Sequence, residues 1–145
     1  MITPDSDYFL LELKPSLIQN AGLGVFAKAD LPDGVIVAEY RGSIFLSEFE
    51  SKIAPLNNKC LTINKDSFIA GNNCVASHIN DIIDLEESKK IKDFIKYSDK
   101  DYNCKFQRSH HKMFVLSIKP IKEGEELYIE YGKNYWKYLI NQEYK

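Results

Sequence analysis

The sequence is poor in the features that mark several large classes of protein. Only three of its 145 residues are cysteine, and Cys60, Cys74 and Cys104 form no CxxC pair. We therefore expect no structural zinc site, and an odd number of scattered cysteines suits a reducing compartment. No apolar run approaches the roughly 18 residues that a membrane-spanning helix needs, so we expect no membrane association.

Charge of one sign is also lacking. The chain carries 19 basic and 21 acidic side chains, which give a net charge of −2. Domains that work mainly by neutralising phosphates are usually strongly basic, so direct binding of nucleic acid is not expected. Residues 1–15 are acidic and lack the basic stretch and apolar core of a signal peptide, so we expect an intracellular protein.

What the chain does have is an ordinary globular composition. Hydrophobic residues make up 44% of the sequence, which argues against global disorder. A chain of this length fits one domain and can bury roughly two thirds of its unfolded surface, so it needs neither disulfides nor a metal to fold. We expect a single domain over residues 1–145.

Short apolar runs separated by glycine and proline turns predict a mainly β protein with short helices. The turn signal Leu31-Pro32-Asp33-Gly34 stands between two β-rich runs, and we expect these runs to pair with each other. Ser47 is expected to cap one or two helical turns, and Asp84 to cap a second short helix. Further strands are predicted at 8–13, at 60–70 as two strands around 64–66, at 113–121 and at 127–132. Residues 82–101 are dense in charge and are interpreted as a surface insertion, and 133–145 as an aromatic tail that is predicted to be helical.

Three separated stretches carry the chemical information. The first is AGLGVFAKADLPDGVIVAEYRG, the second is NNCVASHIND followed after the insertion by YNCKF, and the third is SIKPIKEGEELYIEYGKNYW. Each alone has an ordinary interpretation, since a GxG before a strand is common in hairpins and GEEL with a later YG is usually a turn and a strand. Their order and spacing are the informative feature.

Together the stretches resemble the SET domain, the fold of protein lysine methyltransferases, from about Leu17 to Trp136. The third stretch is the most specific, because the family pattern of Gly-Glu-Glu-Leu, two variable residues and Asp-Tyr-Gly matches Gly124 to Gly132, with Glu130 for the usual Asp. The second departs from the family, which usually has Asn-His where this chain has Asn80-Asp81. The resemblance implies a SET (β-clip) fold of small sheets with a knot-like C-terminal arrangement.

The reaction that the resemblance implies is methyl transfer from S-adenosylmethionine to a lysine ε-amine of a protein. An ordinary lysine is protonated at pH 7 and has no lone pair, but a narrow apolar channel lowers its pKa by desolvation. No dedicated general base is then required, and the remaining work is alignment. A second hypothesis is an inactive SET-fold module that binds peptide or cofactor, which Asp81 and the insertion motivate.

The resemblance also implies roles for single residues. Tyr131 matches the catalytic tyrosine beside the transferring methyl group, and Tyr40 a tyrosine at the lysine channel; for both, ordinary core packing is the alternative. Asp81 is expected to contribute through its backbone or to pair its carboxylate with the cofactor's α-ammonium. The residues implied in cofactor binding are Ala21, Gly22, Leu23, Asn80, Asp81, Tyr131 and Trp136, with packing of a terminal helix as the alternative for Trp136.

Product and partners follow from the same resemblance. Phe106 and Ile129 match the amine pocket, and because neither has a hydroxyl we expect room for more than one methyl group. The cysteines are dispersed, so no metal site is expected. A histone tail is the default substrate and other proteins are an alternative. Dimerisation that completes the substrate site is a further hypothesis. A histone-directed enzyme would be nuclear or chromatin-associated, and otherwise cytoplasmic or in a host cell.

Overall fold

The structure is a computed structural model of the chain. It describes residues 10–54, 56, 59–72, 74–90, 95–132 and 136. The predicted strand at 8–13 is therefore described only from residue 10, and most of the predicted tail helix at 133–145 lies outside the described residues. Along the described part of the chain, no helix is long and apolar enough to cross a membrane.

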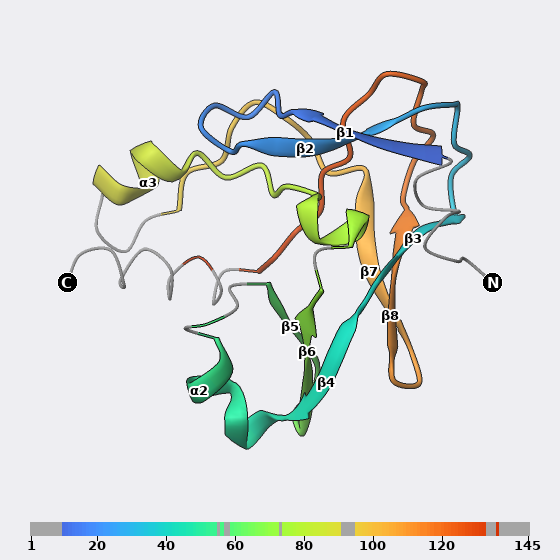
Figure 1. Cartoon of the computed structure of the whole chain (residues 1–145). Helices are drawn as coiled ribbons and strands as arrows, with labels where there is room; N and C mark the ends of the chain where they lie inside the picture. Colours follow the sequence, from blue (N-terminus) through green and yellow to red (C-terminus); the bar gives the residue numbers. More distant parts are fainter. Residues whose placement is uncertain are drawn as a thin grey trace.

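Short antiparallel strands form three small sheets among the described residues, which confirms the mainly β fold (Figure 1). The first sheet pairs β1 (Leu11–Pro15) with β2 (Leu23–Ala27). The second has the order β3-β8-β7 and the third has the order β4-β6-β5. Their strands are β3 (Ile36–Tyr40), β7 (Cys104–Ser109), β8 (Lys112–Ser117), β4 (Gly42–Leu46), β5 (Cys60–Asn64) and β6 (Ser67–Gly71).

The expected pairing of the two strands around the 31–34 turn is wrong. β2 pairs with β1, whereas β3 pairs with β8 in another sheet. The turn does not close a hairpin because Leu31 exchanges both of its backbone hydrogen bonds with Ile121, at 2.7 and 2.9 Å. The chain therefore crosses from one sheet to the next at this point. The pair of strands predicted within 60–70 is confirmed as β5 and β6.

The predicted helical turns exist, but only one of the two predicted caps does. Residues 47–53 form the 3₁₀ helix η1 (Ser47–Phe49) and α2 (Glu50–Ile53). Ser47 is not the N-cap; that position is Leu46 and no side chain caps it. Helix α3 (Leu85–Lys90) is capped as expected, since the Glu87 amide donates to Asp84 Oδ1 at 3.1 Å.

The C-terminal segment, defined here as residues 121–132, is extended but does not form the regular strand predicted at 127–132. It makes isolated bridges instead, which include Asn80 with Tyr128 and Cys104 with Ile129. The Ile129 amide donates to the Asn80 carbonyl at 3.0 Å, and the Tyr128 carbonyl accepts from the Cys104 amide at 3.1 Å. The segment, red in Figure 1, thus runs between two parts of the chain that are distant in sequence.

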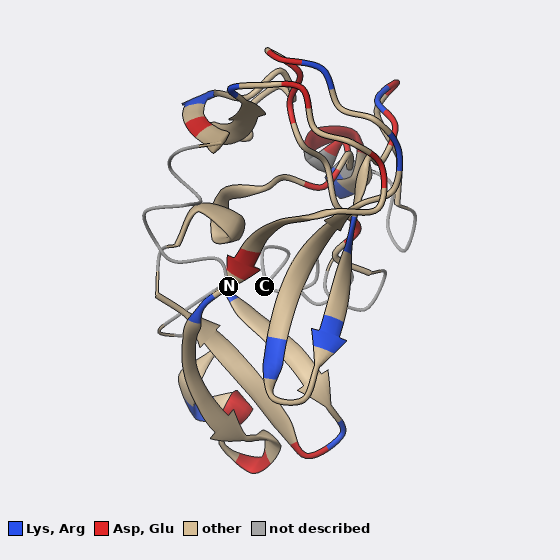
Figure 2. Cartoon of the chain, turned by 90° about the vertical axis from the view of Figure 1, so that its right-hand side faces the viewer, with Lys and Arg blue, Asp and Glu red and all other residues tan. Residues whose placement is uncertain are grey.

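The core lies where these sheets meet the 3₁₀ helix η2 (Val75–His78). Val25, Val75, Ile79, Leu127 and Ile129 are wholly or almost wholly buried in it. A second, smaller cluster of Ile18, Ile82 and Tyr128 carries Ala21 and Tyr102 at its edge. Charged residues of both signs are interspersed over the loops at the top of Figure 2, in keeping with the near-neutral composition.

Candidate active site

The second and third sequence stretches meet at Tyr131. Ile79 is the C-cap of helix η2, and the Tyr131 hydroxyl donates a hydrogen bond to the Ile79 carbonyl. The Tyr131 amide donates to Asp81 Oδ2 at 2.9 Å. The residue implied as catalytic is therefore held at both its backbone and its hydroxyl by the chain around Asn80.

The Asp81 side chain connects several residues of the site. It is only 5% exposed, and its carboxylate accepts four hydrogen bonds. Oδ2 accepts from the Tyr131 amide and from Trp136 Nε1, the latter at 2.7 Å. Oδ1 accepts from the Tyr102 hydroxyl at 2.5 Å and from the amide of Ile82 at 2.6 Å. Sequence reasoning named Asp81 but did not foresee that its carboxylate holds other site residues.

Trp136 lies flat on Tyr131. The two ring centroids are 5.7 Å apart and the ring planes differ by 5°. A parallel arrangement at this distance is a stacked aromatic contact. The structure therefore brings Trp136 to the predicted site, where one of its partners is the catalytic candidate itself.

The first sequence stretch reaches the site through Asn80. Its Nδ2 donates to the Leu23 carbonyl at 3.0 Å, and lies 3.5 Å from Glu126 Oε2. Within the described part of the chain, Asn80 Oδ1 accepts no hydrogen bond. The loop of residues 21–23, expected at the cofactor, is thus tied directly to the residue beside Asp81.

This loop is open enough to fit a ligand. Gly22 has φ +72°, and a Cβ there would meet nothing within 4 Å. Leu23 is 47% exposed. Exposed backbone at Gly22, a free amide oxygen on Asn80 and the aromatic face of the Tyr131–Trp136 pair suit the amino-acid and adenosine parts of S-adenosylmethionine. The described residues therefore fit this cofactor.

Gly24 has a different role from Gly22. A Cβ at Gly24 would lie 2.2 Å from Glu126 Oε2, so the space that a side chain would need is filled by protein. The missing side chain at Gly24 therefore lets Glu126 approach the backbone. Glu126 is 3% exposed and accepts from Ser16 Oγ at 2.6 Å and from the Leu17 amide at 2.8 Å.

Asn103 is a structural counterpart of Asn80 on the other side of the C-terminal segment. Its Nδ2 donates to the Glu126 carbonyl at 2.9 Å, and its Oδ1 accepts from the Tyr128 amide at 2.8 Å. Because Asn103 is 4% exposed, these bonds are shielded from water. Asn103 thus fixes the segment that carries Tyr131.

The residues implied at the lysine channel lie in and against the same core. Tyr40 is buried, its ring meets Phe106 edge-on with centroids 6.0 Å apart, and its hydroxyl donates to the Lys59 carbonyl at 2.5 Å. Phe106 is partly exposed, whereas Ile129 is fully buried. Phe106 and Tyr131 both pack against this core cluster, which contains Tyr40 and Ile129.

Burial shapes the electrostatics around these residues. It raises the pKa of the Tyr102 hydroxyl, and the hydrogen bond to Asp81 raises it further. Burial likewise raises the pKa of Tyr128, whose hydroxyl donates to Glu126 Oε1 at 3.0 Å. It lowers the pKa of Lys59, whose Nζ donates to the Ser77 carbonyl at 2.9 Å. Sequence reasoning missed Lys59, and no motif could have indicated it.

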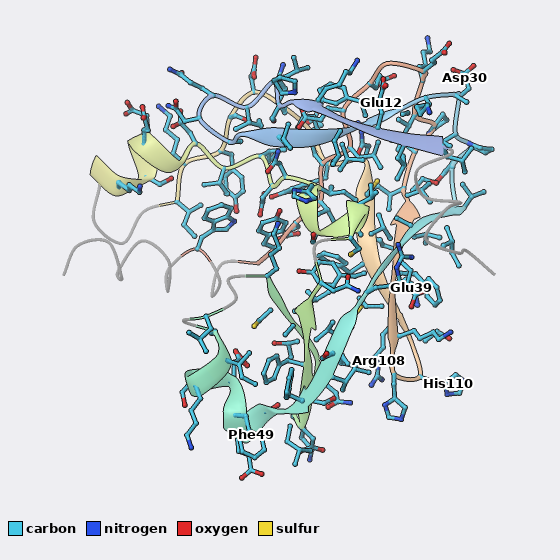
Figure 3. The ribbon with its side chains drawn as sticks, viewed as in Figure 1. Glu12, Asp30, Glu39, Phe49, Arg108 and His110 are labelled. Atoms are coloured by element: carbon cyan, nitrogen blue, oxygen red, sulfur yellow. The ribbon has the colours of Figure 1, made fainter. Side chains whose placement is uncertain are left out.

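No cluster of three or more His, Cys, Asp or Glu side chains suited to a metal ion occurs among the described residues. His110 lies at the tip of the β7–β8 hairpin (Figure 3). Its backbone adopts φ 56° there.

Comparison with known protein families gives one match. The family described as SET domain matches residues 22–132, a span that contains the 21–23 loop almost entirely, the Asn80-Asp81 pair and Tyr131. No curated protein sequence matches the chain significantly.

Proposed function

Because the chain belongs to the SET-domain family, whose members are generally protein lysine methyltransferases, we propose that it transfers a methyl group from S-adenosylmethionine to the ε-amine of a protein lysine. The observation that carries the proposal is the placement of Tyr131. Its hydroxyl is fixed on the Ile79 carbonyl, next to Asn80 and the 21–23 loop, where the cofactor would be held.

The chemistry requires a neutral amine and a fixed alignment. Deprotonating an ordinary lysine at pH 7 costs about 4–5 kcal/mol. A channel beside the buried Tyr40 ring and Phe106 would lower that cost by excluding water. The fixed Tyr131 hydroxyl would then orient the reacting groups, and alignment of this kind supplies several kcal/mol.

The cofactor would be held by Ala21, Gly22, Leu23, Asn80 and the Tyr131–Trp136 pair, and it supplies the methyl group as an electrophile. The open backbone at Gly22 and the Asn80 Oδ1 acceptor support this assignment. The four hydrogen bonds to Asp81 instead come from the protein itself. We therefore assign the Asp81 carboxylate to holding protein groups, in preference to pairing with the α-ammonium of the cofactor.

The substrate is a lysine-bearing protein segment, with a histone tail as the first candidate. In this fold an extended peptide adds as a strand to a sheet edge, which uses backbone hydrogen bonds. The net charge of −2 suits a lysine-rich segment but does not select among proteins. Methylation assays on core histones, read by tandem mass spectrometry, test the histone assignment.

We expect the product to carry more than one methyl group. Neither Phe106 nor Ile129 brings a hydroxyl that would hold a water in the amine pocket. Phe106→Tyr would add one and should shift the product toward monomethyl-lysine. Intact-mass spectrometry of the product peptide measures this, and a wild-type enzyme that stops at monomethyl-lysine would contradict it.

Calorimetric titration with S-adenosylmethionine tests the enzyme proposal against an inactive binding module. The proposal predicts binding, and no heat at millimolar cofactor would refute it. Tyr131→Phe should then abolish methyl transfer while cofactor affinity stays nearly unchanged, because only the hydroxyl is removed. Binding without transfer by the wild type, on all lysine substrates tried, would favour the inactive module.

A further inference from the structure

We propose that Asp81 is a positioning residue that holds the Trp136 indole flat on Tyr131 and so places Trp136 on the cofactor side of the site. The kinetic part of this inference rests on the proposed function. Its structural part, that Asp81 fixes Trp136, does not.

One carboxylate oxygen serves both aromatic residues. Oδ2 accepts from Trp136 Nε1 at 2.7 Å and from the Tyr131 amide at 2.9 Å. The shared acceptor sets the indole against Tyr131, and the rings stack with centroids 5.7 Å apart and planes 5° from parallel. The stack and the hydrogen bond therefore define a single orientation of Trp136.

The four donors explain why an aspartate stands here. A carboxylate has about four acceptor positions and no donor, whereas a carboxamide has one acceptor oxygen and an NH₂, and a neutral imidazole has a single acceptor nitrogen. At 5% exposure, water cannot replace a lost partner. Neither Asn nor His, the residue that the family usually has here, can satisfy the same four donors.

The other oxygen anchors the carboxylate independently of the tail. Oδ1 accepts from the Tyr102 hydroxyl at 2.5 Å and from the Ile82 amide at 2.6 Å. Asp81 is thus fixed through Oδ1 to Tyr102 and Ile82, and its Oδ2 faces Trp136. Because the Tyr131 hydroxyl is held separately by the Ile79 carbonyl, loss of the carboxylate should disturb Trp136 more than that hydroxyl.

Trp136 is the single tryptophan of the chain, so its fluorescence reports directly on this contact. Asp81→Asn should shift its emission to longer wavelength and increase its quenching by acrylamide. The matched control is Asp84→Asn, the same change three residues away at the cap of α3, where Asn also caps well. The control should leave the emission unchanged. Unchanged emission in folded Asp81→Asn, or an equal shift in both variants, would overturn the inference.

Loss of this contact should weaken cofactor binding more than it slows the chemical step. Asp81→Asn should weaken cofactor binding about tenfold, as expected when one hydrogen bond to a charged group is lost, with a smaller effect on kcat. Trp136→Phe keeps a ring but removes the donor, so it should weaken binding similarly. The double variant should be little worse than either single one, and additive losses would contradict the coupling.

The outcomes separate this inference from the proposed function. A wild-type protein that binds no cofactor refutes the methyltransferase proposal, while the emission experiment still decides the role of Asp81. If Asp81→Asn does not fold, Trp136→Phe in the calorimeter decides: unchanged cofactor affinity refutes the inference, and an approximately tenfold loss supports it.

Discussion

At the scale of single residues, Gly22 and Gly24 stand two positions apart in one motif for different physical reasons. Gly22 has φ +72°, a conformation that side chains disfavour, but a Cβ there would have open space around it. Gly24 has no positive φ, but its missing side chain makes room for the Glu126 carboxylate. One is required by backbone conformation and the other by packing.

Alanine substitutions should separate these two requirements. Gly22→Ala should lower the free energy of unfolding by about 1–2 kcal/mol, the cost of a left-handed alanine. Gly24→Ala should lower it by more, because Glu126 must leave the buried hydrogen bonds from Ser16 and Leu17. Urea unfolding measures both, with Gly34→Ala (φ +76°, open space) as a second conformational control. Equal losses at 22 and 24 would contradict the packing explanation.

The sequence pattern identified which residues gather at the site but not what their side chains do there. Tyr131, Asn80, Asp81 and Trp136 were expected together, and the structure places Tyr131, Asp81 and Trp136 in contact, with Asn80 next to Asp81 in the chain. That Asp81 donates nothing and accepts four bonds depends on Tyr102 and Trp136, which approach only in the folded chain. The spacing of residues along the sequence does not show which donors will approach the Asp81 carboxylate in the folded chain.

At the scale of elements, the C-terminal segment is held by isolated backbone bridges and by the Asn103 side chain, where a regular strand would be held by a continuous hydrogen-bonded ladder. The strand predicted at 127–132 correctly indicated an extended backbone. It could not show that the neighbours on the two sides, Asn80 and Cys104, belong to distant segments and each make only an isolated bridge. The wrong pairing around the 31–34 turn has the same origin, because local turn chemistry does not reveal that Leu31 pairs with Ile121.

Asn103→Ala should therefore loosen the C-terminal segment. Two buried backbone groups, the Tyr128 amide and the Glu126 carbonyl, would lose their partner, and the free energy of unfolding should fall by about 2–4 kcal/mol. The matched control is Asn64→Ala. Among the described residues its side chain accepts hydrogen bonds only within its own turn, from the Asp66 amide and Ser67 Oγ, so its loss should cost less than about 1 kcal/mol. Faster hydrogen exchange of the Tyr128 amide in Asn103→Ala would locate the effect, and equal losses in both variants would contradict it.

At the scale of the whole molecule, buried groups with raised pKa values should make the fold sensitive to alkali. Burial raises the pKa of the Cys104 thiol to about 12 and also raises those of Tyr102 and Tyr128. An unfolded cysteine ionises near its ordinary value of 9.0. Between these two values the unfolded chain releases a proton that the folded chain keeps, so stability should fall as pH rises above about 9.

Urea midpoints measured from about pH 8 to about pH 11 test this expectation. The wild type should lose stability steadily over this range, while Cys104→Ala, which removes one of the buried groups, should lose it less steeply. A wild-type midpoint that stays constant up to pH 11 would contradict the burial of these groups.

The most direct test of the central claim follows methyl groups onto lysine. The protein is incubated with S-adenosylmethionine and core histones or a lysine-rich peptide mixture, and the products are sequenced by tandem mass spectrometry beside an identical reaction with Tyr131→Phe. The proposed function predicts methylated lysines with the wild type and none with the variant, at nearly equal cofactor affinity. Equal methylation by both proteins, or a wild type that neither binds the cofactor nor modifies any lysine, would contradict it.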